Sequence, residues 1–215
     1  MDFHSVISRF DLFDKTISDS VWAEVSMPVQ IEKLNSNGIL ETSSRQAILD
    51  QLKVRPALLA HFASEIYKTR GRCRFLEVGT AEGLQSITIA KNVEASEVYT
   101  CDIRDVRHPS FHKLENMHFV LGNSKDLSSN INGTIDMCWI DGSHDHYAVI
   151  NDFLSILHLT NEETVWIFDD FDKRFGCWHD INTLLRHFEK TYAVNFGKTA
   201  SGNPSIISMG IGLKK

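Results

Sequence analysis

The chain has 215 residues, of which 42% are hydrophobic and 23% charged, and its formal net charge is -6. These values are typical of one folded domain, alone or with a helical appendage, and they exclude a largely disordered chain. Because the chain lacks a dense run of Lys and Arg, we expect a small-molecule or protein partner and no nucleic acid.

Residues 1–70 are predicted to form helices and loops, as an N-terminal helical extension of a core over residues 71–215. Apolar residues at helical spacing predict a helix over residues 58–67, with Pro56 in its first turn and Gly71 at its end. A shorter helix is expected to begin near residue 43. Residues 26–37 are expected to form an irregular connector, long enough to fold over a functional site on the core.

Residues 1–10 mix Asp2, His4 and Arg9 with apolar residues, unlike a signal peptide, and no apolar run is long enough to span a bilayer. We therefore expect a cytoplasmic protein that does not bind membranes. The four cysteines have no paired spacing and are interpreted as buried, reduced thiols. The apolar N-terminal helices are consistent with a homodimer.

From Gly71 onward the pattern alternates between strand and helix. Short connections between such elements imply right-handed crossovers and an α/β fold with a mainly parallel sheet. Two final strand-like runs, joined by turn residues, predict a closing hairpin with an antiparallel strand. The expected strands cover residues 73–78, 98–102, 118–121, 135–141, 164–169, 192–199 and 205–213, and the expected helices begin near Gly83, Asp126, His146 and His179.

Four of these strand-like runs end on carboxylates. The carboxyl ends of parallel strands meet at one edge of a sheet, and open α/β sheets bind ligands at that edge. We therefore expect the functional site there. The acids in question are Glu77, Asp102, Asp141 and the adjacent pair Asp169 and Asp170.

The turn after the first strand contains two glycines, Gly79 and Gly83. Glycine lets the backbone approach a ligand, and the following helix start offers unpaired N–H groups. The third glycine of a dinucleotide fingerprint is absent, and Glu82 would repel a pyrophosphate. Asp102 suits hydrogen bonding to ribose hydroxyls, and capping a turn is an equally good interpretation.

Together these residues resemble the class I S-adenosylmethionine-dependent methyltransferases, whose first motif is an acid, any residue, glycine, three residues and glycine. The resemblance runs from about residue 72 to the carboxyl terminus and implies a Rossmann-like, seven-stranded sheet with an antiparallel C-terminal strand. It implies that S-adenosylmethionine lies against the first turn, with its ribose on the second strand and its adenine near the third. The cofactor-binding candidates are Glu77, Gly79, Thr80, Gly83, Asp102, Ser124 and Asp141.

Asp141 closes one predicted strand, and Asp169 and Asp170 close the next. Neighbouring strand ends would bring these three acids within reach of one ion. Three oxygen ligands without Cys suit a hard cation, Mg²⁺ first, with Mn²⁺ or Ca²⁺ as alternatives. Adjacent carboxylates repel one another unless a cation or protons neutralise them. The alternative is that one Asp caps a helix while another contacts the cofactor.

The second half of the core, which carries these three acids, resembles the metal-dependent O-methyltransferases. The resemblance is closer to the macrocin-type enzymes, which methylate sugars on natural products, than to the catechol enzymes. The resemblance implies that Asp141, Asp169 and Asp170 are the metal ligands. Catechol enzymes have Asn and Lys where this chain has Asp170 and His144, and His144 matches the sugar-modifying branch. His144 is the catalytic candidate, because an imidazole suits a general base near neutral pH.

The favoured function is an S-adenosylmethionine-dependent, divalent-metal-dependent O-methyltransferase acting on a hydroxyl of a small polyhydroxylated molecule, either a sugar moiety or a natural product. Three alternatives stay open: a metal-independent small-molecule methyltransferase, a Mg²⁺-dependent phosphohydrolase, and a non-catalytic cofactor-binding protein. The sequence does not identify the methyl acceptor.

Overall fold

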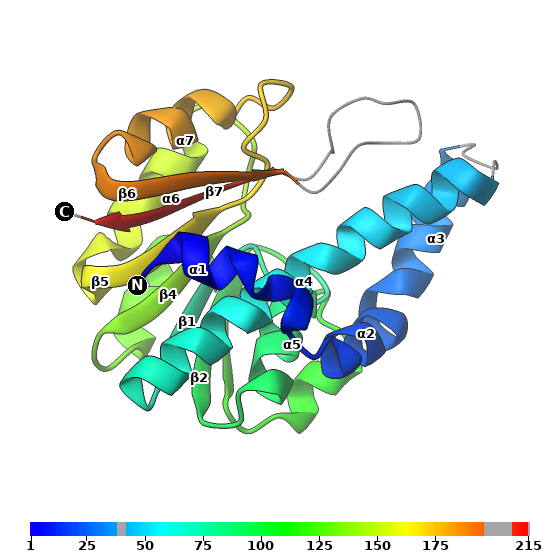
Figure 1. The fold of residues 1–215 in the computed structure, drawn as a ribbon, viewed down its shortest axis with the longest axis horizontal. Helices are drawn as coiled ribbons and strands as arrows, with labels where there is room; N and C mark the ends of the chain where they lie inside the picture. The colour runs from blue at the N-terminus through cyan, green and yellow to red at the C-terminus, as the bar shows by residue number, and fades with distance from the viewer. Residues whose placement is uncertain (38–41, 196–207, 215) are drawn as a thin grey trace.

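The computed structural model describes residues 1–37, 42–195 and 208–214. Its centre is a seven-stranded sheet in the order β3-β2-β1-β4-β5-β7-β6 (Figure 1). All neighbouring strands are parallel except β7, which runs antiparallel to both β5 and β6. This confirms the predicted Rossmann-like sheet and its antiparallel C-terminal strand. The strands are β1 (Cys73–Val78), β2 (Ser96–Asp102), β3 (Met117–Leu121), β4 (Ile135–Ile140), β5 (Thr160–Phe168), β6 (Phe188–Asn195) and β7 (Ser208–Lys214).

Helices cover both faces of the sheet. Residues along a strand point alternately to its two faces, so Phe75 joins the core beneath α1, α2, α4 and α5, whereas Leu76 joins the core beneath α6 and α7. The helices are α1 (Phe3–Ser8), α2 (Thr16–Val21), α3 (Met27–Ser36), α4 (Thr42–Arg70), α5 (Leu84–Asn92), α6 (Ala148–Ile156) and α7 (Trp178–Leu185). Short 3₁₀ and π turns are η1 (Phe10–Leu12), η2 (Trp22–Ser26), η3 (Pro109–Lys113), η4 (Ser124–Asn130) and η5 (Leu157–Leu159).

The N-terminal extension is more helical than predicted. One helix, α4, replaces the two expected between residues 43 and 70, and Pro56 lies inside it rather than in a first turn. Pro56 removes one backbone hydrogen bond, but the helix continues because its next three turns pack into the core. Likewise the expected irregular connector is helix α3, with Pro28 in its first turn, where a missing N–H costs little. Figure 1 shows α3 and the first half of α4 side by side, extending away from the sheet.

Several boundaries match the sequence prediction. Helix α4 ends at Arg70 and is followed by Gly71, whose φ is +70° and whose N–H donates to the carbonyl of Tyr67 at 2.8 Å. The element expected near Asp126 is the 3₁₀ helix η4 rather than an α-helix, and Asn123 and Asp126 form its capping box. Residues 196–199 and 205–207 of the last two predicted strands lie outside the described residues.

The cysteines and the hydropathy of the helices also match expectation. All four cysteines are free and buried. Among the described residues, no helix combines the length and the apolar character needed to cross a membrane.

Candidate active site

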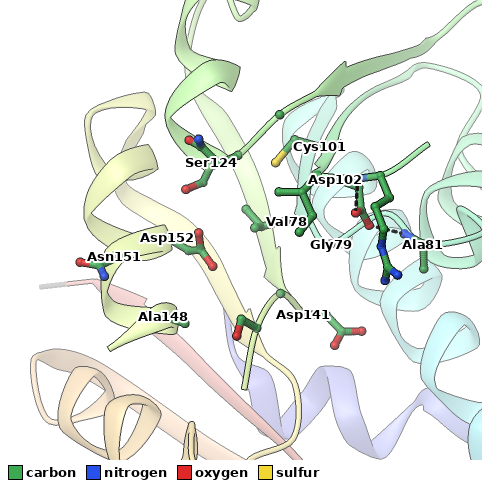
Figure 2. Close-up of a pocket in the computed structure, with 16 residues that line it drawn as sticks. Val78, Gly79, Ala81, Cys101, Asp102, Ser124, Asp141, Ala148, Asn151 and Asp152 are labelled. Carbon is green, nitrogen blue, oxygen red and sulfur yellow. Dashed lines mark hydrogen bonds between the residues drawn. The ribbon is translucent and has the colours of Figure 1, made fainter. Parts of the chain in front are cut away.

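A pocket of about 520 Å³ lies at the carboxyl ends of β1, β2 and β4 (Figure 2). This is where the sheet order reverses direction, with β2 on one side of β1 and β4 on the other, and open α/β sheets bind ligands at such a point. The volume suits a small organic ligand or cofactor. Four of the predicted cofactor-binding residues line the pocket: Gly79, Asp102, Ser124 and Asp141.

Gly79 forms a close backbone contact at the base of this pocket. Its φ is +95°, and a Cβ at this position would lie 1.9 Å from the carbonyl oxygen of Asp141. The Asp141 N–H in turn donates to the carbonyl of Val78 at 2.9 Å. Only glycine fits here, and the contact fixes the turn after β1 against the end of β4.

Asp102 caps turns and lines the pocket at the same time. Its Oδ2 accepts a hydrogen bond from the Ala81 N–H at 2.9 Å, and its Oδ1 accepts one from the Arg104 N–H at 3.0 Å (Figure 2). A carboxylate has about four lone-pair sites, so two acceptor positions remain for a ligand. The two sequence interpretations of Asp102 are therefore compatible.

The other three predicted cofactor-binding residues do not line the pocket. Glu77 is fully buried and accepts hydrogen bonds from the hydroxyls of Ser86 and Thr100, the latter at 3.0 Å. Burial raises the pKa of Glu77 to about 8. The Thr80 hydroxyl lies 2.6 Å from that of Thr100, and Gly83 immediately precedes α5, with a φ of +85°. These residues support the turn between β1 and α5, and their contact with a cofactor stays a prediction.

Asp152 is a pocket residue that the sequence did not suggest. It comes from α6 and lies on the same side of the pocket as Ser124, across from Asp102 (Figure 2). Burial raises its pKa, and a hydrogen bond with Ser124 opposes that shift. The available signal was an acid immediately before Phe153 on the apolar helix α6. A carboxyl at this end gives the pocket an acceptor for a ligand N–H group.

The three acids predicted to bind metal lie together, around one cation of the protein itself. The Arg55 guanidinium on α4 lies 2.9 Å from Asp169 Oδ2, 3.8 Å from Asp141 Oδ2 and 3.9 Å from Asp170 Oδ1. His144 Nε2 lies 2.8 Å from Asp170 Oδ2. Ligand atoms of Asp141, His144 and Asp170 all lie within 4.8 Å of one another. We call Asp141, His144, Asp169, Asp170 and Arg55 the acidic cluster.

The acidic cluster is crowded with negative charge. Burial raises the pKa of Asp169 well above its ordinary value; Arg55 opposes that shift, while Asp141 and Asp170 add to it. Burial and Asp141 likewise raise the pKa of Asp170. Burial disfavours the charged form of Arg55, but Asp169, Asp141 and Asp170 together outweigh burial and raise its pKa. The positive charge of the Arg55 guanidinium therefore partly neutralises three carboxylates.

Comparison with protein families finds one similarity, over the part of the chain that carries most of this site. Residues 76–171 match the family described as a methyltransferase domain. No curated protein matches the chain significantly.

Solved structures are similar in fold across most of the chain. A candidate caffeoyl-CoA O-methyltransferase from Staphylococcus aureus matches with a TM-score of 0.56 and 14% identity over 86% of this chain and 99% of that chain. The S-adenosylhomocysteine (SAH)-bound methyltransferase PaMTH1 from Podospora anserina matches at 0.52 and 12%, over 82% and 89%. Cofactor-bound Rv0187 from MTB matches at 0.59 and 13%, over 98% and 91%.

Proposed function

We propose that this chain, whose residues 76–171 match a methyltransferase domain, is an S-adenosylmethionine-dependent methyltransferase that acts on a hydroxyl of a small polyhydroxylated molecule, with the help of a divalent cation. The observation that carries the proposal is the position of Asp141. It lines the cofactor pocket and also belongs to the acidic cluster. A methyl donor in the pocket and an acceptor at the cluster would therefore be neighbours, which is the arrangement that methyl transfer requires.

The residues present fit a hard divalent cation, with Mg²⁺ as the first candidate. Arg55 offsets one of the three carboxylate charges of the acidic cluster, so two negative charges remain when all three acids are ionised. Asp141 and Asp170 retain partly exposed side chains, at 21% and 11%, from which oxygen ligands can be offered. Proteins commonly bind Mg²⁺ through one or two carboxylates and leave its other positions to water and substrate.

When bound, such a cation lowers the pKa of an acceptor hydroxyl and helps to orient it. His144 is the proposed proton acceptor. With the Nε2–H of the imidazole facing Asp170, Nδ1 carries the lone pair that can take a proton. Asp170 would then stabilise the imidazolium that results. The Phe175 ring packs against the imidazole in a T-shaped arrangement, with ring centroids 5.3 Å apart, and would limit its rotation. Gly79 and Asp102 would position the cofactor.

The test is methyl transfer to a panel of sugars and polyhydroxylated natural products, followed by mass spectrometry, in Mg²⁺ and in EDTA. We expect a mass increase of one methyl group in Mg²⁺ and loss of turnover in EDTA that added Mg²⁺ restores. Calorimetry with SAH under both conditions is the control, because cofactor binding by the pocket should survive chelation. Full activity in EDTA would contradict the metal requirement and leave the transferase assignment intact.

One observation favours a second candidate, a metal-independent methyltransferase. Arg55 already places a positive charge 2.9 Å from Asp169, so the acidic cluster has an internal counter-ion. In that case the acids would bind cofactor and acceptor directly, and EDTA would leave turnover unchanged.

A further inference from the structure

Arg55 is the least expected member of the acidic cluster, because it comes from the N-terminal extension rather than from a strand end. Its side chain is only 15% exposed. Of the three carboxylates it faces, Asp169 is nearest by almost 1 Å, and the Asp169 side chain is 2% exposed. Arg55 and Asp169 therefore form a buried ion pair inside the larger group of charges.

The packing of α4 holds Arg55 at this position. Leu59, Phe62 and Ile66 lie four, seven and eleven residues further along the helix, on the same face as Arg55, and all three are fully buried. The guanidinium carbon lies 6.0 Å from the centroid of the buried Trp139 ring. Arg55 thus lies on a helix that is packed into the core.

Attraction to the three carboxylates, rather than a hydrogen bond at Nε, holds the Arg55 guanidinium in place. Within the described part of the chain, Arg55 Nε is buried and has no hydrogen-bond partner. A buried arginine must be paired, since an isolated buried charge is strongly unfavourable. Any cation that took Asp169 as a ligand would remove the nearest partner of Arg55 and would lie beside its positive charge.

We propose that Arg55 is a positioning residue that withholds Asp169 from the divalent cation, so that Asp141 and Asp170 are the carboxylates that bind it. This inference rests on the proposed function, because it concerns the same cation. Arg55 also sets the charge of the acidic cluster, by leaving two uncompensated carboxylates rather than three. Two carboxylates match a divalent cation and leave coordination positions for an acceptor oxygen.

The experiment measures the affinity of the full chain for Mn²⁺, supplied as MnCl₂, from the electron paramagnetic resonance signal of free Mn²⁺. Two double variants have the same net charge as the wild-type protein: R55M/D169N and R55M/D141N. The first removes the proposed ion pair, and the second removes a proposed ligand. Because neither leaves an additional uncompensated charge in the acidic cluster, the comparison isolates which carboxylate binds the metal.

We expect R55M/D169N to bind Mn²⁺ within about threefold of wild type and R55M/D141N to bind at least about tenfold more weakly. If R55M/D169N loses as much affinity as R55M/D141N, Asp169 is a ligand and the inference is wrong. Thermal unfolding followed by circular dichroism checks that each variant is folded.

Single variants give a second route that does not depend on the doubles. R55M should bind Mn²⁺ at least about threefold more tightly than wild type, because one positive charge is removed and Asp169 is released. R55K keeps the charge and should stay near wild type. The matched control is K53M, which removes a positive charge from the same helix, where Lys53 pairs with Asp19 at 2.9 Å.

Equal affinities of R55M and wild type would overturn the inference, and so would an equal gain in K53M. If neither wild type nor R55M binds Mn²⁺, the metal requirement of the proposed function fails together with the inference. If wild type binds Mn²⁺ but R55M/D169N loses as much affinity as R55M/D141N, the inference about Arg55 is wrong while the metal requirement of the proposed function stands.

Discussion

Thr100 and Glu77 are register partners across β2 and β1, and the Thr100 hydroxyl donates to the Glu77 carboxyl at 3.0 Å. This contact lies inside the protein, where burial raises the Glu77 pKa from 4.5 to about 8. The folded protein therefore keeps Glu77 protonated at a pH where the unfolded chain has lost that proton.

The first prediction concerns stability against pH. Between pH 4.5 and 8 the folded state binds more protons at Glu77 than the unfolded state, so this residue makes stability fall as pH rises through that window. The loss for wild type should be on the order of a few kcal/mol. E77Q does not titrate and should lack it. Urea unfolding at pH 5 and pH 8 measures the difference, and parallel pH dependences of the two proteins would contradict the assignment.

The second prediction concerns the close backbone contact at Gly79. G79A should destabilise the protein by at least about 3 kcal/mol, because its Cβ would overlap the Asp141 carbonyl, and the backbone shift should also weaken SAH binding. G71A is the matched control. Gly71 also has a positive φ but has open space around its Cβ position, so only about 1–2 kcal/mol is expected. Equal losses would mean that φ strain alone explains both.

The third prediction concerns the proposed ribose-binding role of Asp102. D102N should weaken SAH binding by roughly 10- to 100-fold, because a hydrogen bond to a charged acceptor is lost. D105N removes the same charge from the following loop, where Asp105 pairs with Arg107, and should leave affinity unchanged. Calorimetric titration with SAH measures both variants. If D102N binds as wild type does, Asp102 only caps its two turns.

The fourth prediction separates two nearby histidines. H144Q should lower kcat by roughly 10²- to 10⁴-fold, the usual range for loss of a general base, with SAH affinity unchanged. His146 faces the buried Asp180 at 3.1 Å instead of the acidic cluster, so H146Q should retain most activity. Single-turnover rates measured by mass spectrometry test both variants. A larger loss in H146Q would move the base to His146.

Much of the sheet could be predicted because its signals are local. An apolar run that ends on an acid predicts both a buried strand and the edge at which it stops, and the end of β4 beside Asp141 fits that prediction. The position of Gly79 followed from the need for close backbone approach. In these cases neighbouring residues in the sequence carried the information.

The helical extension was harder to predict because proline more often ends a helix than continues one, and both prolines of this region lie within helices. Pro28 occupies a first turn and Pro56 lies inside a long helix whose packing offsets one missing hydrogen bond. Arg55 was missed for a different reason, since its partners are more than 80 residues away. A signal was present, however: Arg55 occupies the position one turn before Leu59 on the buried stripe of α4, where a charged residue needs a buried counter-ion.

The shared core of α4 and the sheet has a practical consequence for protein engineering. Leu59, Phe62 and Ile66 belong to the same buried cluster as Phe75 and Trp139. A fragment starting at residue 71 would keep the strands and α5 but lose α1, α2 and α4, so much of one apolar face of the sheet would be exposed, which favours aggregation. It would also lack Arg55. Shortening the chain from its amino terminus therefore removes one member of the acidic cluster and exposes apolar surface that α4 covers.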